Sequence, residues 1–166
     1  MNTIRIATPA DAETIARIVN AAFEVERPVR GPVGDRTSPT RIREHMADGD
    51  VFFVMESADD DSKIVGTVFI RITTDAVSGL KTGYFGMLAV DPSLQRSGIG
   101  RALREHCERY CRDHGCTTMT LSTGDFRTEL LPYYQRAGYQ VTSIEPGPEK
   151  WGLAKPFKIV NMAKPL

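Results

Sequence analysis

The sequence lacks several features that would set it apart from ordinary globular proteins. It has only three cysteines in 166 residues, an odd and low number that argues against a disulfide framework. It lacks a charge of one sign, because 21 lysines and arginines match 21 aspartates and glutamates, so composition gives no sign of binding to nucleic acid or anionic membranes. No stretch approaches the roughly 18 apolar residues of a membrane span, and residues 1–9 lack a signal-peptide core. We therefore expect a cytoplasmic protein without nucleic-acid or membrane partners.

The three cysteines, Cys107, Cys111 and Cys116, lie near two histidines, which raises the question of a zinc site. Their spacing has a simpler explanation, because they fall on or beside an apolar helical stripe, where a free cysteine behaves as a small hydrophobic residue. The alternating charges on the other side of the same predicted helix indicate a solvated face. We expect no metal.

What the chain does have is a length and a hydrophobic content of 41% that suit one domain, placed at residues 1–166. Residue periodicity predicts a strand, two helices, three strands, a helix, a strand, a helix and two strands. The predicted strands are 3–7, 51–55, 64–72, 84–90, 117–122, 139–143 and 157–162. The predicted helices are 12–23, 40–47, 98–114 and 129–137, and residues 24–40 are expected to form a loop rich in proline, glycine and charge.

The most informative segment, residues 84–101, reads YFGMLAVDPSLQRSGIGR. An apolar run typical of a buried strand stops at Pro92, and Gln95, Gly98 and Gly100 then form the pattern Q-x-x-G-x-G at a helix start. Helix starts have unpaired N–H groups and partial positive charge, and glycines let a backbone approach an anion. The segment lacks the Lys-Ser/Thr of a P-loop and the third glycine of a dinucleotide fingerprint. We expect the segment to bind a phosphorylated small molecule, and the alternative is a helix start whose two glycines serve packing alone.

In this context the segment resembles the acyl-CoA loop of the GNAT superfamily of acyl-CoA-dependent N-acetyltransferases. Residues 131–139, LPYYQRAGY, also look like the family's aromatic-Tyr-x-x-x-Gly-aromatic motif, and the predicted element order is the family's order. The resemblance covers nearly the whole chain. It implies an α+β, three-layer fold with a mixed, mostly antiparallel central sheet of about six to seven strands and helices on both faces.

The resemblance also implies a site for acetyl-CoA as co-substrate. Strands 84–90 and 117–122 are expected to lie side by side and splay apart, with a bulge near residues 87–89 that frees backbone groups for the pantetheine arm. The N–H groups of residues 96–101 would then meet the pyrophosphate. The implied acetyl-CoA-binding residues are Leu88, Ala89, Val90, Gln95, Arg96, Ser97, Gly98, Ile99, Gly100 and Arg101.

Tyr134 matches the family's tyrosine near the CoA sulfur, whose implied role is that of a general acid. A tyrosine, with a pKa of about 10, is still protonated at neutral pH and can donate a proton to a departing thiolate. The family's asparagine seven residues before this tyrosine is replaced by Arg127, so its contact with CoA is not carried over.

The general base is left open, because strand 84–90 has no acidic residue. Glu24 and Glu26 are candidate acceptor-site residues that could attract an amine or orient a water, and they could equally be exposed helix-end charges. The same segment carries three arginines, so an acceptor with both an amine and a carboxylate is also open.

We expect an acetyl-CoA-dependent N-acetyltransferase that acetylates a primary amine, that of a small molecule, directly through a tetrahedral intermediate. The alternatives are a non-catalytic acyl-CoA-binding regulatory module, a protein N-acetyltransferase, and an interaction protein that keeps only the fold. Tyr134 favours catalysis, because a binding module needs no acid, and the two loop glycines favour acyl-CoA binding. The sequence does not identify the acceptor or the acyl group, and it leaves a homodimer open.

Overall fold

The computed structural model describes residues 1–31, 34–148 and 155–166. Their strands form one seven-stranded sheet in the order β1-β2-β3-β4-β5-β7-β6. The strands are β1 (Thr3–Ile6), β2 (Val51–Glu56), β3 (Ile64–Thr74), β4 (Lys81–Val90), β5 (Cys116–Gly124), β6 (Gln140–Pro146) and β7 (Lys158–Pro165). The pair β4–β5 is parallel, whereas every other neighbouring pair is antiparallel. The predicted mixed, mostly antiparallel sheet is therefore confirmed.

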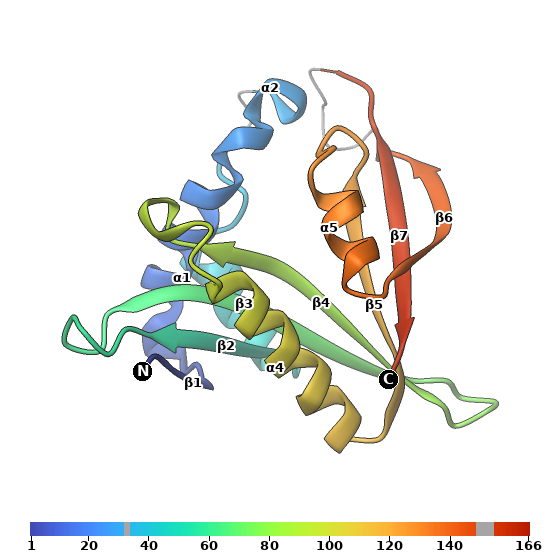
Figure 1. Ribbon diagram of the computed structural model, residues 1–166, viewed down its shortest axis with the longest axis horizontal. Helices are drawn as coiled ribbons and strands as arrows, with labels where there is room; N and C mark the ends of the chain where they lie inside the picture. The colour runs from blue at the N-terminus through green and yellow to red at the C-terminus, as the bar shows by residue number, and fades with distance from the viewer. Residues whose placement is uncertain (32–33, 149–154) are drawn as a thin grey trace.

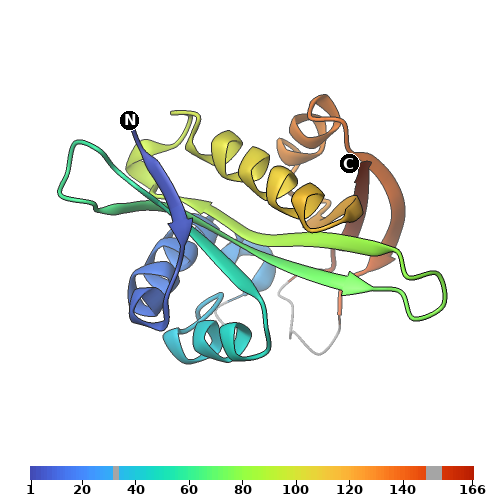
Figure 2. The ribbon, with the colours of Figure 1, turned by 90° about the horizontal axis from the view of Figure 1, so that it is seen from below.

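The helices cover both faces of this sheet, which gives the expected three layers (Figure 2). They are α1 (Ala12–Ala22), α2 (Arg27–Arg30), α3 (Pro39–Ala47), α4 (Ile99–Asp113) and α5 (Leu130–Arg136), with 3-10 turns η1 (Pro9–Asp11), η2 (Phe23–Glu26) and η3 (Pro92–Leu94). Helices α1 and α3 lie on one face, and α4 and α5 lie on the other. No helix in the described part of the chain is both long and apolar enough to cross a bilayer.

Helix α4 packs closely on the sheet because two glycines lie beneath it. A Cβ atom added at Gly66 would lie 2.8 Å from Ile99 Cγ2, and one added at Gly83 would lie 2.6 Å from Cys111 Sγ. Both contacts are too short for a real Cβ atom, so any larger residue would push the helix away from the sheet. These glycines therefore fix the position of α4, whose first turn follows the predicted phosphate loop.

The cysteines occupy the apolar side of this packing, as the helical spacing predicts. Cys107 and Cys111 are fully buried, and Cys116 at the start of β5 is also buried. Burial raises the pKa of the Cys111 thiol to about 12, and it raises the pKa of Cys107 well above its ordinary value. The thiols of Cys107 and Cys111 are therefore protonated core groups at neutral pH.

The charged face of α4 is not solvated throughout, in contrast to the prediction. Arg104 and Glu108 are both buried. The Glu108 carboxylate accepts hydrogen bonds from Arg104 Nη1 at 2.7 Å, from the Tyr139 hydroxyl at 2.8 Å and from Lys164 Nζ at 3.1 Å. Charge alternation did not reveal this network because its other partners lie after α5 and on β7.

The predicted loop over residues 24–40 is also wrong in part, since it contains η2, α2 and the start of α3. Pro28 stands in the first turn of α2, where a missing N–H costs no helical hydrogen bond. Ser38 caps α3 by accepting a hydrogen bond from the Arg41 N–H at 3.2 Å. Asn20 on α1 bonds to the main chain of Thr37, so the start of α3 lies beside the end of α1.

Candidate active site

The bulge expected on β4 is present. Thr67 pairs with Ala89 and Phe69 pairs with Gly86, so β4 has one residue more than β3 between these pairs. Met87, inside this interval, has a φ of +49°, which is rare for a residue other than glycine. Because an extra residue interrupts the ladder, the bulge leaves backbone groups of β4 free for another partner.

The splay between β4 and β5 is present as well. The two strands pair from Lys81 and Cys116 to Tyr84 and Thr120, and no pair between them is formed further along. Strand β4 nevertheless continues to Val90, and the two ribbons diverge as an open V (Figure 1). One edge of β4 is therefore without a strand partner over its last six residues.

The segment after β4 turns directly into α4. Asp91 accepts hydrogen bonds from the Ser93 N–H at 3.0 Å and the Ser93 hydroxyl at 2.7 Å, and these bonds lower the pKa of its carboxyl. The first intrahelical bond of α4 runs from the Ala102 N–H to the Gly98 carbonyl at 3.0 Å. The N–H groups of residues 99–101 precede it and have no acceptor within the helix. These free N–H groups and the exposed loop that precedes them lie on one surface.

The two glycines of this loop have different roles. Gly98 has a φ of +86°, so a side chain there would be strained, although a Cβ atom would meet nothing within 4 Å. Gly100 has an ordinary helical position, and a Cβ atom added to it would lie 3.6 Å from Val90 Cγ2, a normal contact. Packing within the protein therefore does not require a glycine at position 100, and the open space above it is available to a ligand.

The structure brings the predicted acetyl-CoA residues together at the end of β4 and the start of α4, but not all of their side chains face outward. Ala89 and Ile99 are buried in the core, so only their main chains could meet a ligand. Arg101 Nε is 2.8 Å from Glu105 Oε1 in an exposed pair, whereas Arg96 is exposed and has no ion-pair partner among the described residues.

Tyr134 on α5 reaches back to β4 across the V. Its side chain is only 7% exposed, and its ring lies 6.0 Å from that of Phe85 and 5.9 Å from that of Tyr139. Burial raises the pKa of the Tyr134 hydroxyl well above its ordinary value, so the group is a protonated donor at neutral pH. Within the described ranges its hydroxyl has no hydrogen-bond partner, which leaves it free to meet a reacting atom.

The structure separates the two candidate glutamates. The Glu24 side chain is 57% exposed and pairs with Arg27 at 2.5 Å. Glu24 is therefore an exposed helix-end charge, which was the alternative to an acceptor-site role. The Glu26 side chain is only 13% exposed, and its Oε1 lies 3.3 Å from Arg127 Nη1. Arg127 thus joins η2 to the segment between β5 and α5. No local pattern could predict this contact, because the partners are 101 positions apart.

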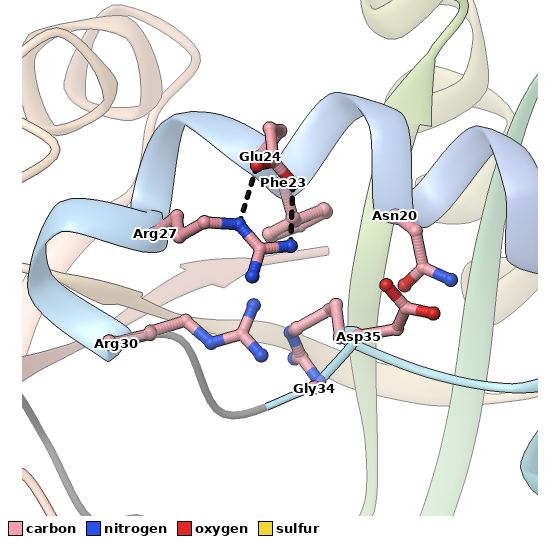
Figure 3. Close-up of a pocket in the computed structure, with 9 residues that line it drawn as sticks. Asn20, Phe23, Glu24, Arg27, Arg30, Gly34 and Asp35 are labelled. Carbon is pink, nitrogen blue, oxygen red and sulfur yellow. Dashed lines mark hydrogen bonds and ion pairs between the residues drawn. The ribbon is translucent and has the colours of Figure 1, made fainter.

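A pocket lies beside these residues, between α1, η2, α2 and the segment that leads to α3 (Figure 3). Its lining residues are Asn20, Phe23, Glu24, Arg27, Arg30, Gly31, Gly34, Asp35 and Arg36. Loss of water around its guanidinium lowers the pKa of Arg36; the charges of Glu26 and Tyr84 act in the opposite direction. Phe23 and Glu24 line the pocket from η2, the same turn that carries Glu26. No group of three or more metal-ligating side chains occurs in the described part of the chain.

Comparison with known proteins agrees with this geometry. Residues 15–139 match the model of the acetyltransferase (GNAT) family. The chain is 32% identical over 146 residues to an aminoglycoside N(6')-acetyltransferase type 1 of Stenotrophomonas maltophilia, covering 84% of this chain and 87% of that protein. It is 29% identical over 147 residues to a mycothiol acetyltransferase of Cellulomonas flavigena, covering 86% of this chain. The chain spans only 41% of the length of that mycothiol acetyltransferase.

Solved structures share the fold at low sequence identity. A ribosomal-protein-alanine N-acetyltransferase of Brucella melitensis has a TM-score of 0.74 at 16% identity, with 99% of both chains covered. The Salmonella typhimurium protein yncA, whose structure contains acetyl-CoA, has a TM-score of 0.75 at 20% identity, with 99% of this chain and 94% of that chain covered. The family match spans most of the sequence, and the fold agrees with it. The chain therefore belongs to the acetyltransferase (GNAT) family.

Proposed function

We propose that this protein is an acetyl-CoA-dependent N-acetyltransferase that acetylates a primary amine of a small molecule. One observation carries the proposal: the unpaired edge of β4, the bulge at Met87 and the exposed start of α4 follow one another along a single surface. A free strand edge suits the amides of a pantetheine arm, and a helix start suits a pyrophosphate.

The residues present fit acetyl-CoA through their main chain more than through their side chains. The N–H groups of residues 96–101 bind the pyrophosphate, and Gly100 leaves room for its approach. The guanidinium of Arg96, which has no ion-pair partner among the described residues, adds positive charge at the same place. Leu88 and Val90 contribute backbone hydrogen bonds along the pantetheine arm.

Three residues or groups then serve the transfer. An alkylamine with a pKa of about 10.4 is neutral in only about one molecule in 2,500 at pH 7, so a proton must be removed before attack. Glu26 is the largely enclosed carboxylate on the acceptor side, and an ordered water would pass this proton from the amine to its carboxylate. Free N–H groups near the bulge stabilise the developing oxyanion. Tyr134 protonates the leaving thiolate, whose ordinary pKa is about 8.5.

A small-molecule acceptor is favoured by the names of the relatives, which include an aminoglycoside and several mycothiol acetyltransferases. The test is thiol release from acetyl-CoA with a panel of small primary amines and short peptides, followed by mass analysis of the product. Acetyl-CoA binding without release on any amine would favour the non-catalytic acyl-CoA-binding module. Release with peptides alone would favour a protein acceptor.

A further inference from the structure

The pocket beside α1 concentrates positive charge next to the acceptor side of the site. Three arginines line it, Arg27 and Arg30 from α2 and Arg36 from the segment before α3, together with the carboxylates of Glu24 and Asp35. In Figure 3 the guanidinium groups of Arg27 and Arg30 point into the same space from one wall, and Asp35 lies near Asn20 on the other.

Two of these arginines have no carboxylate partner in the part of the chain that the structure describes. Glu24 holds Arg27 through two contacts, Oε1 to Nε at 2.5 Å and Oε2 to Nη2 at 2.9 Å. Within residues 1–31, 34–148 and 155–166, neither Arg30 nor Arg36 has an ion pair. Two unpaired guanidinium groups in one pocket repel each other, and a bound oxyanion would remove this repulsion.

The backbone that carries Arg36 is held in place. The Asn20 side chain donates to the Thr37 carbonyl at 3.0 Å and accepts from the Thr37 N–H at 2.9 Å. The Arg36 guanidinium itself lies over the Phe23 ring, 5.4 Å from its centroid. Because little ordering remains to be done when a ligand binds, these contacts favour recognition by Arg36.

The pocket also lies close to the reacting groups. The Phe23 ring under Arg36 belongs to η2, the turn that also carries Glu26. Phe23 packs against the same core cluster as Tyr84, the last residue of β4 that pairs with β5 before the strands diverge. The next residue of β4, Phe85, has its ring 6.0 Å from that of Tyr134, the proposed acid. An anion held by Arg36 would therefore place the rest of a small molecule near the open V.

We propose that the acceptor is an amine that also carries an oxyanion, a carboxylate or a phosphonate, and that Arg30 and Arg36 bind this anion. This inference rests on the proposed acetyltransferase function. The planar guanidinium groups offer paired N–H donors that match the oxygens of such an anion. Glu24 neutralises Arg27 and Asp35 offsets part of the remaining charge, which favours a carboxylate or a phosphonate over a more highly charged polyphosphate.

The test compares matched amines that differ only in the anion. Thiol release is measured with amino acids and with aminophosphonates, each against its uncharged counterpart, the amino acid amide or the aminophosphonate diester. The charged member of the preferred pair should have a kcat/KM roughly 10- to 100-fold higher. Arg30→Ala and Arg36→Gln should remove most of this preference by raising the acceptor KM, and they should leave the KM for acetyl-CoA unchanged.

Controls separate this role from a general loss of charge or of fold. Arg112→Ala removes one positive charge at the exposed end of α4 and should change neither KM. Arg36→Lys keeps the charge but loses the paired donors, so it should fall between the wild type and Arg36→Gln. Unfolding temperatures measured for each variant identify any that fail to fold.

Equal kcat/KM values for the two members of every pair, with turnover otherwise normal, would overturn the inference and leave the proposed function standing. A rise in the KM for acetyl-CoA would assign the arginines to CoA phosphates instead. If no amine is acetylated, the proposed function fails, and calorimetric titration with the same pairs still decides the inference. Tighter binding of the charged member, lost in Arg30→Ala, would support an anion site, whereas equal affinities would refute it.

Discussion

Replacing Tyr134 by phenylalanine isolates one oxygen atom of the proposed site. The ring stays in place, because it packs against Phe85, Tyr133 and Tyr139 through contacts that phenylalanine keeps. The lost hydroxyl has no hydrogen-bond partner among the described residues. Removing an unpaired polar atom from a buried position forfeits no hydrogen bond, so the free energy of unfolding should change by less than about 1 kcal/mol.

The effect on turnover should be much larger. A positioned general acid contributes about 10²- to 10⁴-fold, and a 10²-fold loss of kcat corresponds to about 2.7 kcal/mol of transition-state stabilisation. Because burial raises the pKa of Tyr134, the hydroxyl stays protonated throughout the usual assay range. Wild-type kcat should therefore show no decrease from tyrosine ionisation below about pH 10.

The assay is steady-state thiol release with the preferred acceptor, together with thermal unfolding and acetyl-CoA affinity. Tyr134→Phe should lower kcat while leaving the unfolding temperature and the acetyl-CoA affinity nearly unchanged. Tyr133→Phe is the matched control, with an expected smaller effect. Normal turnover by a folded Tyr134→Phe variant would refute the acid role and would mean that solvent protonates the thiolate.

Three further perturbations test the rest of the site and the fold. Gly98→Glu should abolish acetyl-CoA binding measured by calorimetry. Gly98→Ala and the control Gly79→Ala replace glycines that share a positive φ and open space, so each should lower the free energy of unfolding by about 1–2 kcal/mol. Only Gly98→Ala should also weaken acetyl-CoA binding. Asp50→Asn should destabilise the fold by about 1–3 kcal/mol at pH 7, because the 4%-exposed carboxylate accepts hydrogen bonds from Arg71 and His45. Burial alone would raise the pKa of Asp50, but those hydrogen bonds lower it, so this stabilisation is present above about pH 4 and should fade in thermal scans as the pH falls through the lowered value. Glu26→Gln should lower kcat/KM for the acceptor and spare the KM for acetyl-CoA; unchanged acceptor kinetics would remove Glu26 from the site.

The elements that position the cofactor could be predicted because their signals are local. The apolar run, Pro92 and the spacing of Gln95, Gly98 and Gly100 lie within one short segment, and the structure has a strand, a turn and a helix start there. The buried cysteine stripe of α4 follows from helical periodicity in the same way.

The acceptor side could not be predicted because its contacts join distant or irregular segments. The four-residue helix α2 is too short for periodicity to reveal, since nucleation makes such helices dependent on their surroundings. The Glu26–Arg127 ion pair needs the β5–α5 segment to lie beside η2, a property of the complete fold. The sequence made Glu24 and Glu26 equal candidates for the acceptor site. Only the tertiary structure shows that Glu24 is exposed and that Glu26 is largely enclosed.

Hydrogen exchange with and without saturating acetyl-CoA tests the central claim most directly, because it locates the cofactor without requiring the acceptor. The N–H groups that bind the ligand should exchange more slowly in its presence. We predict protection in peptides covering residues 88–90 and 96–101, and none of comparable size in the β3–β4 hairpin around Gly79. Saturated binding with protection elsewhere and none at the start of α4 would contradict the account.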